Sequence, residues 1–200
     1  MKRYEIVRCG EAPDWDGVCP LNVDTVLWLT DVGIRMTQQL CHNAERLFVR
    51  QVCAEEHIRA EYNDPLGMVC EDSCMEFFFM PAGDDRYINF EINPNGCFYL
   101  GFGRERGERT RLLPDGAGER FDLRTRRLAG GWECTYALPL AYLRQFFGRD
   151  FSYSSGAVLR ANCYKCGDLT ERPHYLSWNP VTSAAPDFHR PSDFGEMVLL

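Results

Sequence analysis

The feature that most constrains the fold of this chain is a succession of short segments in which apolar and polar residues alternate, separated by turn-forming clusters. This spacing is typical of an all-β domain, because successive side chains of a strand point to opposite faces of the sheet. One segment, Pro139–Phe147, has the pattern of a short helix, with proline in its first turn and Gly148 as a stop. We therefore expect a single antiparallel β-sandwich with one short helix, in one domain over residues 1–200. The clearest strand segments are Tyr4–Cys9, Ile34–Cys41, Arg46–Cys53, Ser73–Met80, Tyr87–Asn93, Gly96–Gly103, Trp132–Leu138 and Ala157–Lys165.

Composition and charge limit the functional classes that fit this chain. It is 45% hydrophobic and 13% aromatic, enough for a substantial core. The net charge of −7 argues against a nucleic-acid partner, and no apolar run has the length of a membrane helix. The first residues, MKRYEIVRCGEAP, lack the apolar region of a signal peptide, and ten cysteines then fit a reduced compartment, so we expect a cytoplasmic protein. The arginine- and glycine-rich stretch Arg104–Arg127 predicts a solvated hairpin or loop.

The alternation divides three of the expected strands into an apolar face and a polar face. The opposite, polar faces combine carboxylates, amides, a guanidinium and phenols, a mixture that suits a polyhydroxylated ligand. An ordinary solvent-facing sheet remains the alternative. The apolar faces are expected to carry Met75, Phe77, Phe79, Ile88, Phe90, Ile92, Leu159, Ala161 and Cys163. The opposite faces are expected to carry Asp72, Cys74, Glu76, Phe78, Tyr87, Asn89, Glu91, Arg160, Asn162 and Tyr164.

Metal chemistry is suggested by a Cys-x-x-Cys pair, Cys163 and Cys166. An odd separation on a strand sends the two thiols to opposite faces, and no turn lies between them, so we expect no zinc knuckle. A zinc site assembled from Cys166, His174 and His189 is a separate alternative. Our preferred expectation is that no metal is bound there, and that Asp168 and the two histidines brace the loop after Gly167.

Hydrolysis is a further alternative, because Glu76 and Glu91 on adjacent strands form a carboxylate pair of the kind that glycosidases use. The same pair equally suits hydrogen bonds to a ligand or pairing with arginine. The sequence contains no Gly-x-Ser-x-Gly, phosphate-binding loop or His-Glu-x-x-His motif. We therefore expect a protein that is not an enzyme.

The four tryptophans have different settings. Trp28 and Trp132 lie in apolar strand-like patterns and are expected in the core, and Trp15 is expected to anchor the N-terminal segment. Trp178 follows Tyr175-Leu-Ser and precedes Asn-Pro, a loop-like setting in which an indole can stack on the C–H face of a pyranose ring. Packing of Trp178 against its own sheet is the equal alternative.

Several of these stretches together resemble the carbohydrate-binding family 9-like domains. The resemblance is carried by EDSCMEFFFMP (71–81), YINFEINPNG (87–96), the strand-to-helix passage after Trp132, and RANCYKCGDLTERPHYLSWNPV with DFHRPSDFG (160–195). It implies a β-sandwich similar to modules of bacterial xylanases that bind the reducing ends of plant-wall oligosaccharides. In such modules two tryptophans hold the terminal sugar, and structural calcium is present. No compact acidic loop here demands calcium, and no other cofactor is expected.

The resemblance also implies a set of ligand-binding residues, although Cys70 stands where relatives often have an aromatic residue. Phe78, Tyr164 or Tyr175 is expected to substitute for the missing ring, or else the stacking is one-sided. The expected ligand is a small oligosaccharide or sugar end, bound without chemistry. A zinc-binding or protein-interaction module on the same fold, or a glycoside hydrolase, are the alternatives. The residues expected to contact sugar are Trp178, Glu76, Arg160, Asn162, Lys165 and Tyr175.

Overall fold

The computed structural model describes residues 1–114 and 116–200 and is built almost entirely of strands. Each of the eight strand segments expected from the sequence is present, within two residues at either end. The expected helix is α2, and Gly148 ends it with a φ of 91°. The helices are α1 (Ala117–Arg120) and α2 (Leu140–Phe147). The strands are β1 (Arg3–Arg8), β2 (Leu21–Val23), β3 (Thr25–Val26), β4 (Arg35–His42), β5 (Arg46–Ala54), β6 (Cys74–Pro81), β7 (Tyr87–Ile92), β8 (Phe98–Gly103), β9 (Arg109–Arg111), β10 (Arg124–Leu128), β11 (Gly131–Pro139), β12 (Val158–Cys166), β13 (Tyr175–Ser177) and β14 (Gly195–Leu199).

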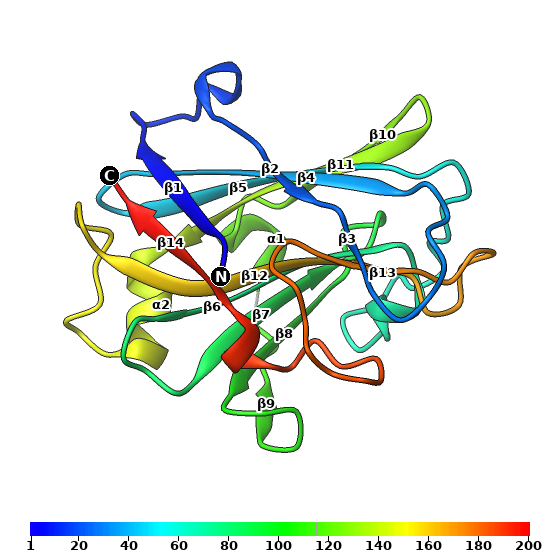
Figure 1. Cartoon of the computed structure of the whole chain (residues 1–200). Helices are drawn as coiled ribbons and strands as arrows, with labels where there is room; N and C mark the ends of the chain where they lie inside the picture. The colour runs from blue at the N-terminus through cyan, green and yellow to red at the C-terminus, as the bar shows by residue number, and fades with distance from the viewer. Residues whose placement is uncertain (115) are drawn as a thin grey trace.

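The strands form two facing layers, which confirms the predicted β-sandwich (Figure 1). The upper layer contains β10, β11, β5, β4 and β2, and the lower layer contains β14, β12, β6, β7, β8 and β9, with β13 and β3 beside β12. Strand β1 joins the layers at one edge, because its first half pairs with β14 and its second half with β4. Both pairings of β1 are parallel, so the prediction of a purely antiparallel sandwich is wrong at this one strand.

The main core lies between the two layers. The lower layer contributes the apolar faces predicted from the alternation, including Met75, Phe77 and Phe90, and the upper layer contributes Trp132 as expected. Cys163 belongs to this core, whereas Cys166 lies in a second cluster on the outer face of the lower layer. The prediction that these two thiols point to opposite sides of their strand is therefore confirmed.

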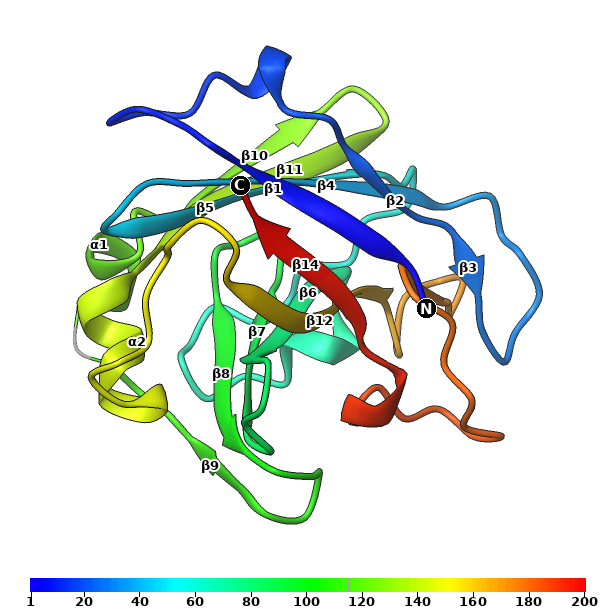
Figure 2. The same ribbon diagram turned by 60° about the vertical axis from the view of Figure 1, so that its left-hand side comes forward.

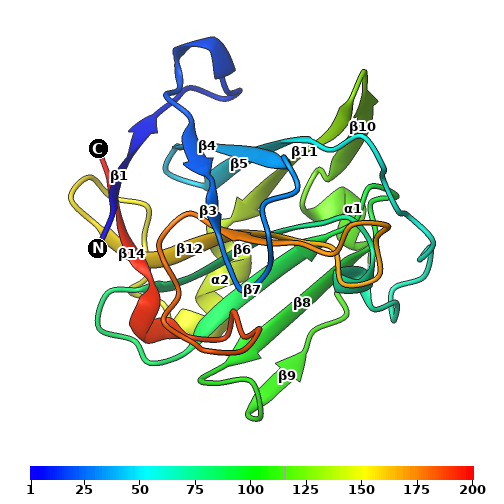
Figure 3. The ribbon, with the colours of Figure 1, turned by 45° about the vertical axis from the view of Figure 1, so that its right-hand side comes forward.

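The outer face of the lower layer is not left to solvent. Residues 178–194, which run from β13 to β14, pass over it (orange to red in Figures 2 and 3). Phe188 from this segment stacks on Tyr164 with ring centroids 4.1 Å apart. Phe78 and Tyr87 are buried beneath the same segment. The covering segment leaves part of the sheet face open as a cavity, described below. Within the described residues, no helix combines the length and apolar character needed to cross a membrane.

Candidate functional site

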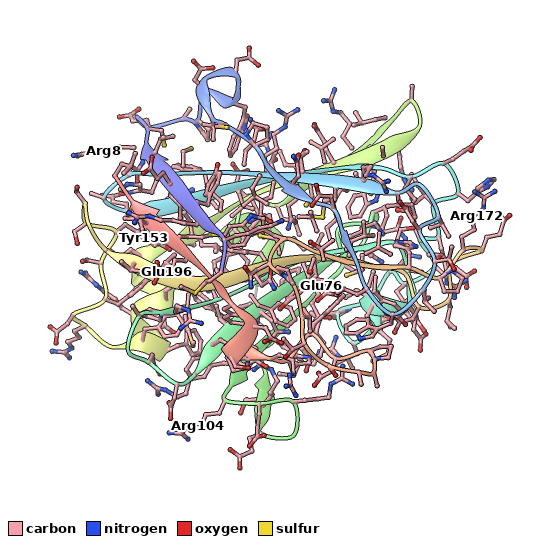
Figure 4. The ribbon with its side chains drawn as sticks, in the orientation of Figure 1. Arg8, Glu76, Arg104, Tyr153, Arg172 and Glu196 are labelled. Carbon is pink, nitrogen blue, oxygen red and sulfur yellow. The ribbon has the colours of Figure 1, made fainter. Side chains whose placement is uncertain are left out.

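A cavity of about 360 Å³ opens on the outer face of the lower layer, and we call it the sheet pocket. Its floor is the face on which the sequence placed polar and aromatic groups, and Glu76, labelled in Figure 4, lies there beside β12. Its walls come from the turn before β6, from the loop after β12 and from the covering segment 178–194. The floor residues are Glu76, Glu91, Tyr99, Arg109, Cys166 and Tyr175.

Two carboxyl groups stand side by side on this floor. Glu76 on β6 is directly opposite Glu91 on β7 in the strand register. Glu91 accepts a hydrogen bond from Asn89 Nδ2 at 2.7 Å, and Glu76 accepts one from Cys166 Sγ at 2.9 Å. Burial raises the pKa of Glu91 to about 7. Burial and the neighbouring charge of Glu91 raise the pKa of Glu76 well above its usual value. Near neutral pH the pair can therefore both donate and accept hydrogen bonds.

Aromatic rings form one wall of the pocket. Trp28 contacts Tyr175 edge-on, with centroids 5.4 Å apart, and Phe188 at 5.5 Å. Trp28 Nε1 donates to the carbonyl oxygen of Ser183 at 2.7 Å, which fixes the indole against the covering segment. The Trp28 backbone is left-handed, with a φ of 57°, a conformation that residues other than glycine rarely adopt. Such strain is found most often where a side chain is held for a function.

Trp28 corrects a prediction, because its sequence pattern indicated a core residue. The structure places it half-buried at the pocket, where the chain bends immediately after β3. Strand β3 has only two residues and pairs with β13, and the next amide, of Leu27, donates to Tyr175 O. No signal in the sequence identified this bend.

Two arginines from the stretch predicted to be solvated also reach the pocket. Arg109 lies on β9, with its guanidinium 4.0 Å from the centroid of the Tyr87 ring and a hydrogen bond to Asn89 Oδ1. Arg106 lies at the rim and pairs with Asp187 at 3.3 Å. The prediction of a solvated hairpin is therefore wrong for Arg109, because β9 pairs with β8 and turns this side chain onto the sheet.

Of the six residues predicted to contact ligand, only Glu76 and Tyr175 line the sheet pocket. Trp178 does not: its side chain is 4% exposed and belongs to the core between the layers. The reason is the period of β13, which places Tyr175 on the outer face and Leu176 and Trp178 on the inner one. The predicted stacking by Trp178 does not fit this position, and packing against its own sheet is what the structure has.

Asn162 and Arg160 face outward but support the backbone instead of lining the pocket. Asn162 is fully buried, donates to Asn179 O at 2.9 Å and accepts from Asn179 N at 2.8 Å. Arg160 donates to Phe194 O at 2.9 Å. Asn162 therefore holds the start of the covering segment, just after β13, and Arg160 holds its end, just before β14. Of the three residues suggested as substitutes for the missing ring, Phe78 and Tyr164 are fully buried beneath this segment, and Tyr175 lines the pocket.

Lys165 lies on the inner face of β12 and cannot reach the pocket. Its Nζ is 3.2 Å from Glu55 Oε2, and both side chains are at most 2% exposed. The ammonium also donates to Cys166 O and contacts His174 Nε2, each at 2.7 Å. Burial alone would lower the pKa of Lys165, but the charge of Glu55 and nearby thiols outweighs it and raises the pKa above its usual value. Lys165 is thus one half of a buried ion pair.

The zinc set proposed from sequence is not assembled. Cys166 faces outward, His174 faces Lys165 on the inner side, and His189 Nδ1 contacts the hydroxyl of Tyr87 at 2.7 Å. Burial lowers the pKa of His174 to about 4 and that of His189 to about 3. His174 does brace the loop, through Arg172 O at 2.8 Å, whereas Asp168 and His189 line the sheet pocket.

Within residues 1–114 and 116–200, one group of three side chains could hold a metal ion: Cys74, Glu76 and Cys166. Two thiols are poor ligands for calcium, and no group of three carboxylates meets in the same part of the chain. This group therefore does not fit the calcium implied by the family resemblance.

A larger hollow of about 890 Å³ lies at the turn before β7. Four of its five charged side chains already pair with one another, Asp84 with Arg86 at 2.9 Å and Asp85 with Arg104 at 2.7 Å. It lacks the combination of facing carboxylates and fixed aromatic rings found in the sheet pocket. We therefore take the sheet pocket as the candidate site.

Comparison with solved structures shows how widely this architecture is shared. A candidate carbohydrate-binding protein from Bacteroides uniformis ATCC 8492 superimposes with a TM-score of 0.87 at 27% identity, over all of this chain and 99% of that one. A family 9 carbohydrate-binding module from Caldicellulosiruptor kristjanssonii, solved with glucose, has a TM-score of 0.70 at 16% identity, over 100% and 96% of the two chains. The same organism's module with cellotriose gives 0.69 at 15%, over 99% and 93%.

The sequence itself matches the family model for carbohydrate-binding family 9 over residues 14–199. A comparison with curated proteins found no significant match. The family consists of non-catalytic carbohydrate-binding modules, which confirms the prediction that the chain is not an enzyme. With nearly its whole length inside the match, this chain belongs to carbohydrate-binding family 9.

Proposed function

We propose that the chain binds a small oligosaccharide, or the end of one, non-covalently in the sheet pocket. The observation that carries this proposal is the convergence of a fixed indole and paired carboxyl groups in one cavity of the lower layer. Its volume of about 360 Å³ lies at the small end of the range for small-molecule sites, which favours one or two sugar rings over a long chain.

Trp28 takes the stacking role that the sequence assigned to Trp178. Its indole offers a flat apolar face for the C–H groups of a pyranose ring, and Tyr175 adds a second aromatic edge. The Ser183 hydrogen bond holds the indole before ligand arrives, so little side-chain entropy is lost on binding. Stacking is one-sided where Cys70 replaces an aromatic residue, because Cys70 lines the same cavity.

The polar groups of the pocket select hydroxyl positions. Glu76 and Glu91 accept from sugar hydroxyls when ionised and donate when protonated. Arg109 lines the same cavity and holds its positive charge over the Tyr87 ring. A sugar with a hydroxyl missing or inverted leaves such a group unpaired in a buried site, at a cost of about 1–3 kcal/mol.

Titration calorimetry with glucose and cellotriose, the ligands of the two related modules, tests this function. We expect saturable binding that Trp28→Ala weakens by about 1–3 kcal/mol, since an aromatic anchor is removed. Trp15→Ala is the matched control, because it deletes a half-buried indole outside the pocket and should leave affinity unchanged. Absence of binding at millimolar concentration across a panel of mono- and oligosaccharides would reject the proposal.

A further inference from the structure

Two thiols and a carboxyl group meet at the floor of the sheet pocket. Cys74 and Glu76 lie two residues apart on β6 and so share one face of the strand. Cys166 on β12 is directly opposite Cys74 in the strand register. Cys166 Sγ donates to Glu76 Oε1 at 2.9 Å, and the three potential ligand atoms all lie within 4.8 Å of one another.

The cluster is buried and borders the sheet pocket. The three side chains are at most 2% exposed, yet Cys166 and Glu76 border the cavity. A group bound by the cluster would therefore be shielded from bulk water and would have one free position, directed into the pocket. Cys70 also lines the pocket, and its backbone carbonyl oxygen lies 3.6 Å from Cys166 Sγ.

The kind of ligand follows from these donor atoms. Two thiolates and a carboxylate suit a soft or borderline divalent cation such as Zn²⁺, and do not suit Ca²⁺ or Mg²⁺. Zinc bond lengths of about 2.3 Å to sulfur and 2.0–2.2 Å to oxygen require ligand atoms roughly 3–4 Å apart. Cys166 Sγ and Glu76 Oε1 are 2.9 Å apart, and all three ligand atoms lie within 4.8 Å of one another, so the cluster is compact enough for one ion after adjustment of the side chains.

We propose that Cys74, Glu76 and Cys166 bind one Zn²⁺ ion, or a similar thiophilic divalent cation, with an open coordination position facing the sheet pocket. Each thiol releases its proton to solvent as its sulfur coordinates the ion, and any proton on Glu76 is released likewise. The site goes beyond sugar recognition and does not depend on it.

Metal titration of the reduced, chelator-treated and desalted full-length protein tests the site. Zn²⁺ in the calorimeter should bind at one equivalent, with an enthalpy that depends on the buffer because protons are released. Cd²⁺ should produce an ultraviolet thiolate charge-transfer band that saturates at one equivalent. Cys74→Ala and Cys166→Ala should each weaken binding by more than the roughly 10- to 100-fold that loss of an outer-shell partner costs.

Cys163→Ala is the matched control, because it removes a buried thiol from the same strand but from the opposite face. It should bind Zn²⁺ and Cd²⁺ as the unaltered protein does. Glu76→Gln keeps both thiols, so it should keep the cadmium band while losing zinc affinity, and it serves if an alanine variant fails to fold. No uptake of either ion at micromolar concentration, or a band that persists in both cysteine variants, would overturn the site. Sugar titrations are scored separately, so either proposal can fail alone.

Discussion

Lys165→Met tests whether Lys165 stabilises the fold through its ion pair with Glu55 or contacts the sugar. The Lys165 ammonium and the Glu55 carboxylate are 3.2 Å apart with both side chains at most 2% exposed. Removing one partner of a buried pair leaves the other charge unpaired and typically costs about 3–5 kcal/mol. Glu55 would keep the Ser73 hydroxyl at 2.7 Å and Trp132 Nε1 at 3.4 Å, which favours the lower half of that range.

Urea unfolding followed by tryptophan fluorescence measures this loss as a lower midpoint at an unchanged slope. Lys2→Met is the control, because Lys2 is exposed and its ion pair with Asp24, at 3.7 Å, contributes little. Adding Glu55→Gln to Lys165→Met should recover part of the stability, since no buried charge is then left alone. The folded variant should bind sugar normally, because its altered side chain lies on the opposite face of β12 from the pocket.

A stability loss below about 1 kcal/mol would refute the ion-pair reasoning. Loss of sugar binding in a variant of normal stability would refute the structural assignment and return Lys165 to the ligand site predicted from the sequence.

Three further predictions concern the site and its supports. Protonation of Glu91 stabilises the fold below about pH 4.5, and this contribution is lost as the pH rises through the folded pKa of about 7. Urea titrations at a series of pH values should therefore show that the free energy of unfolding of Glu91→Gln, relative to that of the unaltered protein, rises by on the order of 3 kcal/mol from about pH 4.5 to pH 8. Free energies of unfolding that change with pH in the same way in both proteins would contradict this. Gly195→Ala should cost about 1–3 kcal/mol in the same assay, because an added Cβ would lie 2.5 Å from Trp178 Cζ3, and a neutral result would mean that the indole is not where it is described. In native thiol labelling Cys19, the exposed cysteine, should react first, and faster modification of Cys166 would show that the pocket floor is open.

The strand alternation carried most of what could be predicted about the fold. Long strands such as β6, β7 and β12 have enough residues for the period to define both faces, and these faces are confirmed. The short strands β2, β3, β9 and β13 have two or three residues each, too few for any period to emerge. Their positions follow from pairing with distant segments, which local sequence does not specify.

The differences between the predicted contact residues and the residues that line the sheet pocket have the same cause. The side of β13 that faces the core depends on its register with β12, so the sequence could not decide between stacking and packing for Trp178. Lys165 is different: it is two residues from Cys163, which was assigned to the core face, and the period alone placed it inward. A lysine is unfavourable in a core unless its charge is paired, and the partner, Glu55, is 110 positions away in the sequence.

A crystal structure of the protein with saturating glucose or cellotriose would show directly whether sugar binds in the sheet pocket. We predict a sugar ring there, with its C–H face on the Trp28 indole and hydroxyl groups within hydrogen-bonding distance of Glu76 or Glu91. A sugar bound instead at the hollow before β7, or against the end of β12 near Arg160, with the sheet pocket empty, would contradict it.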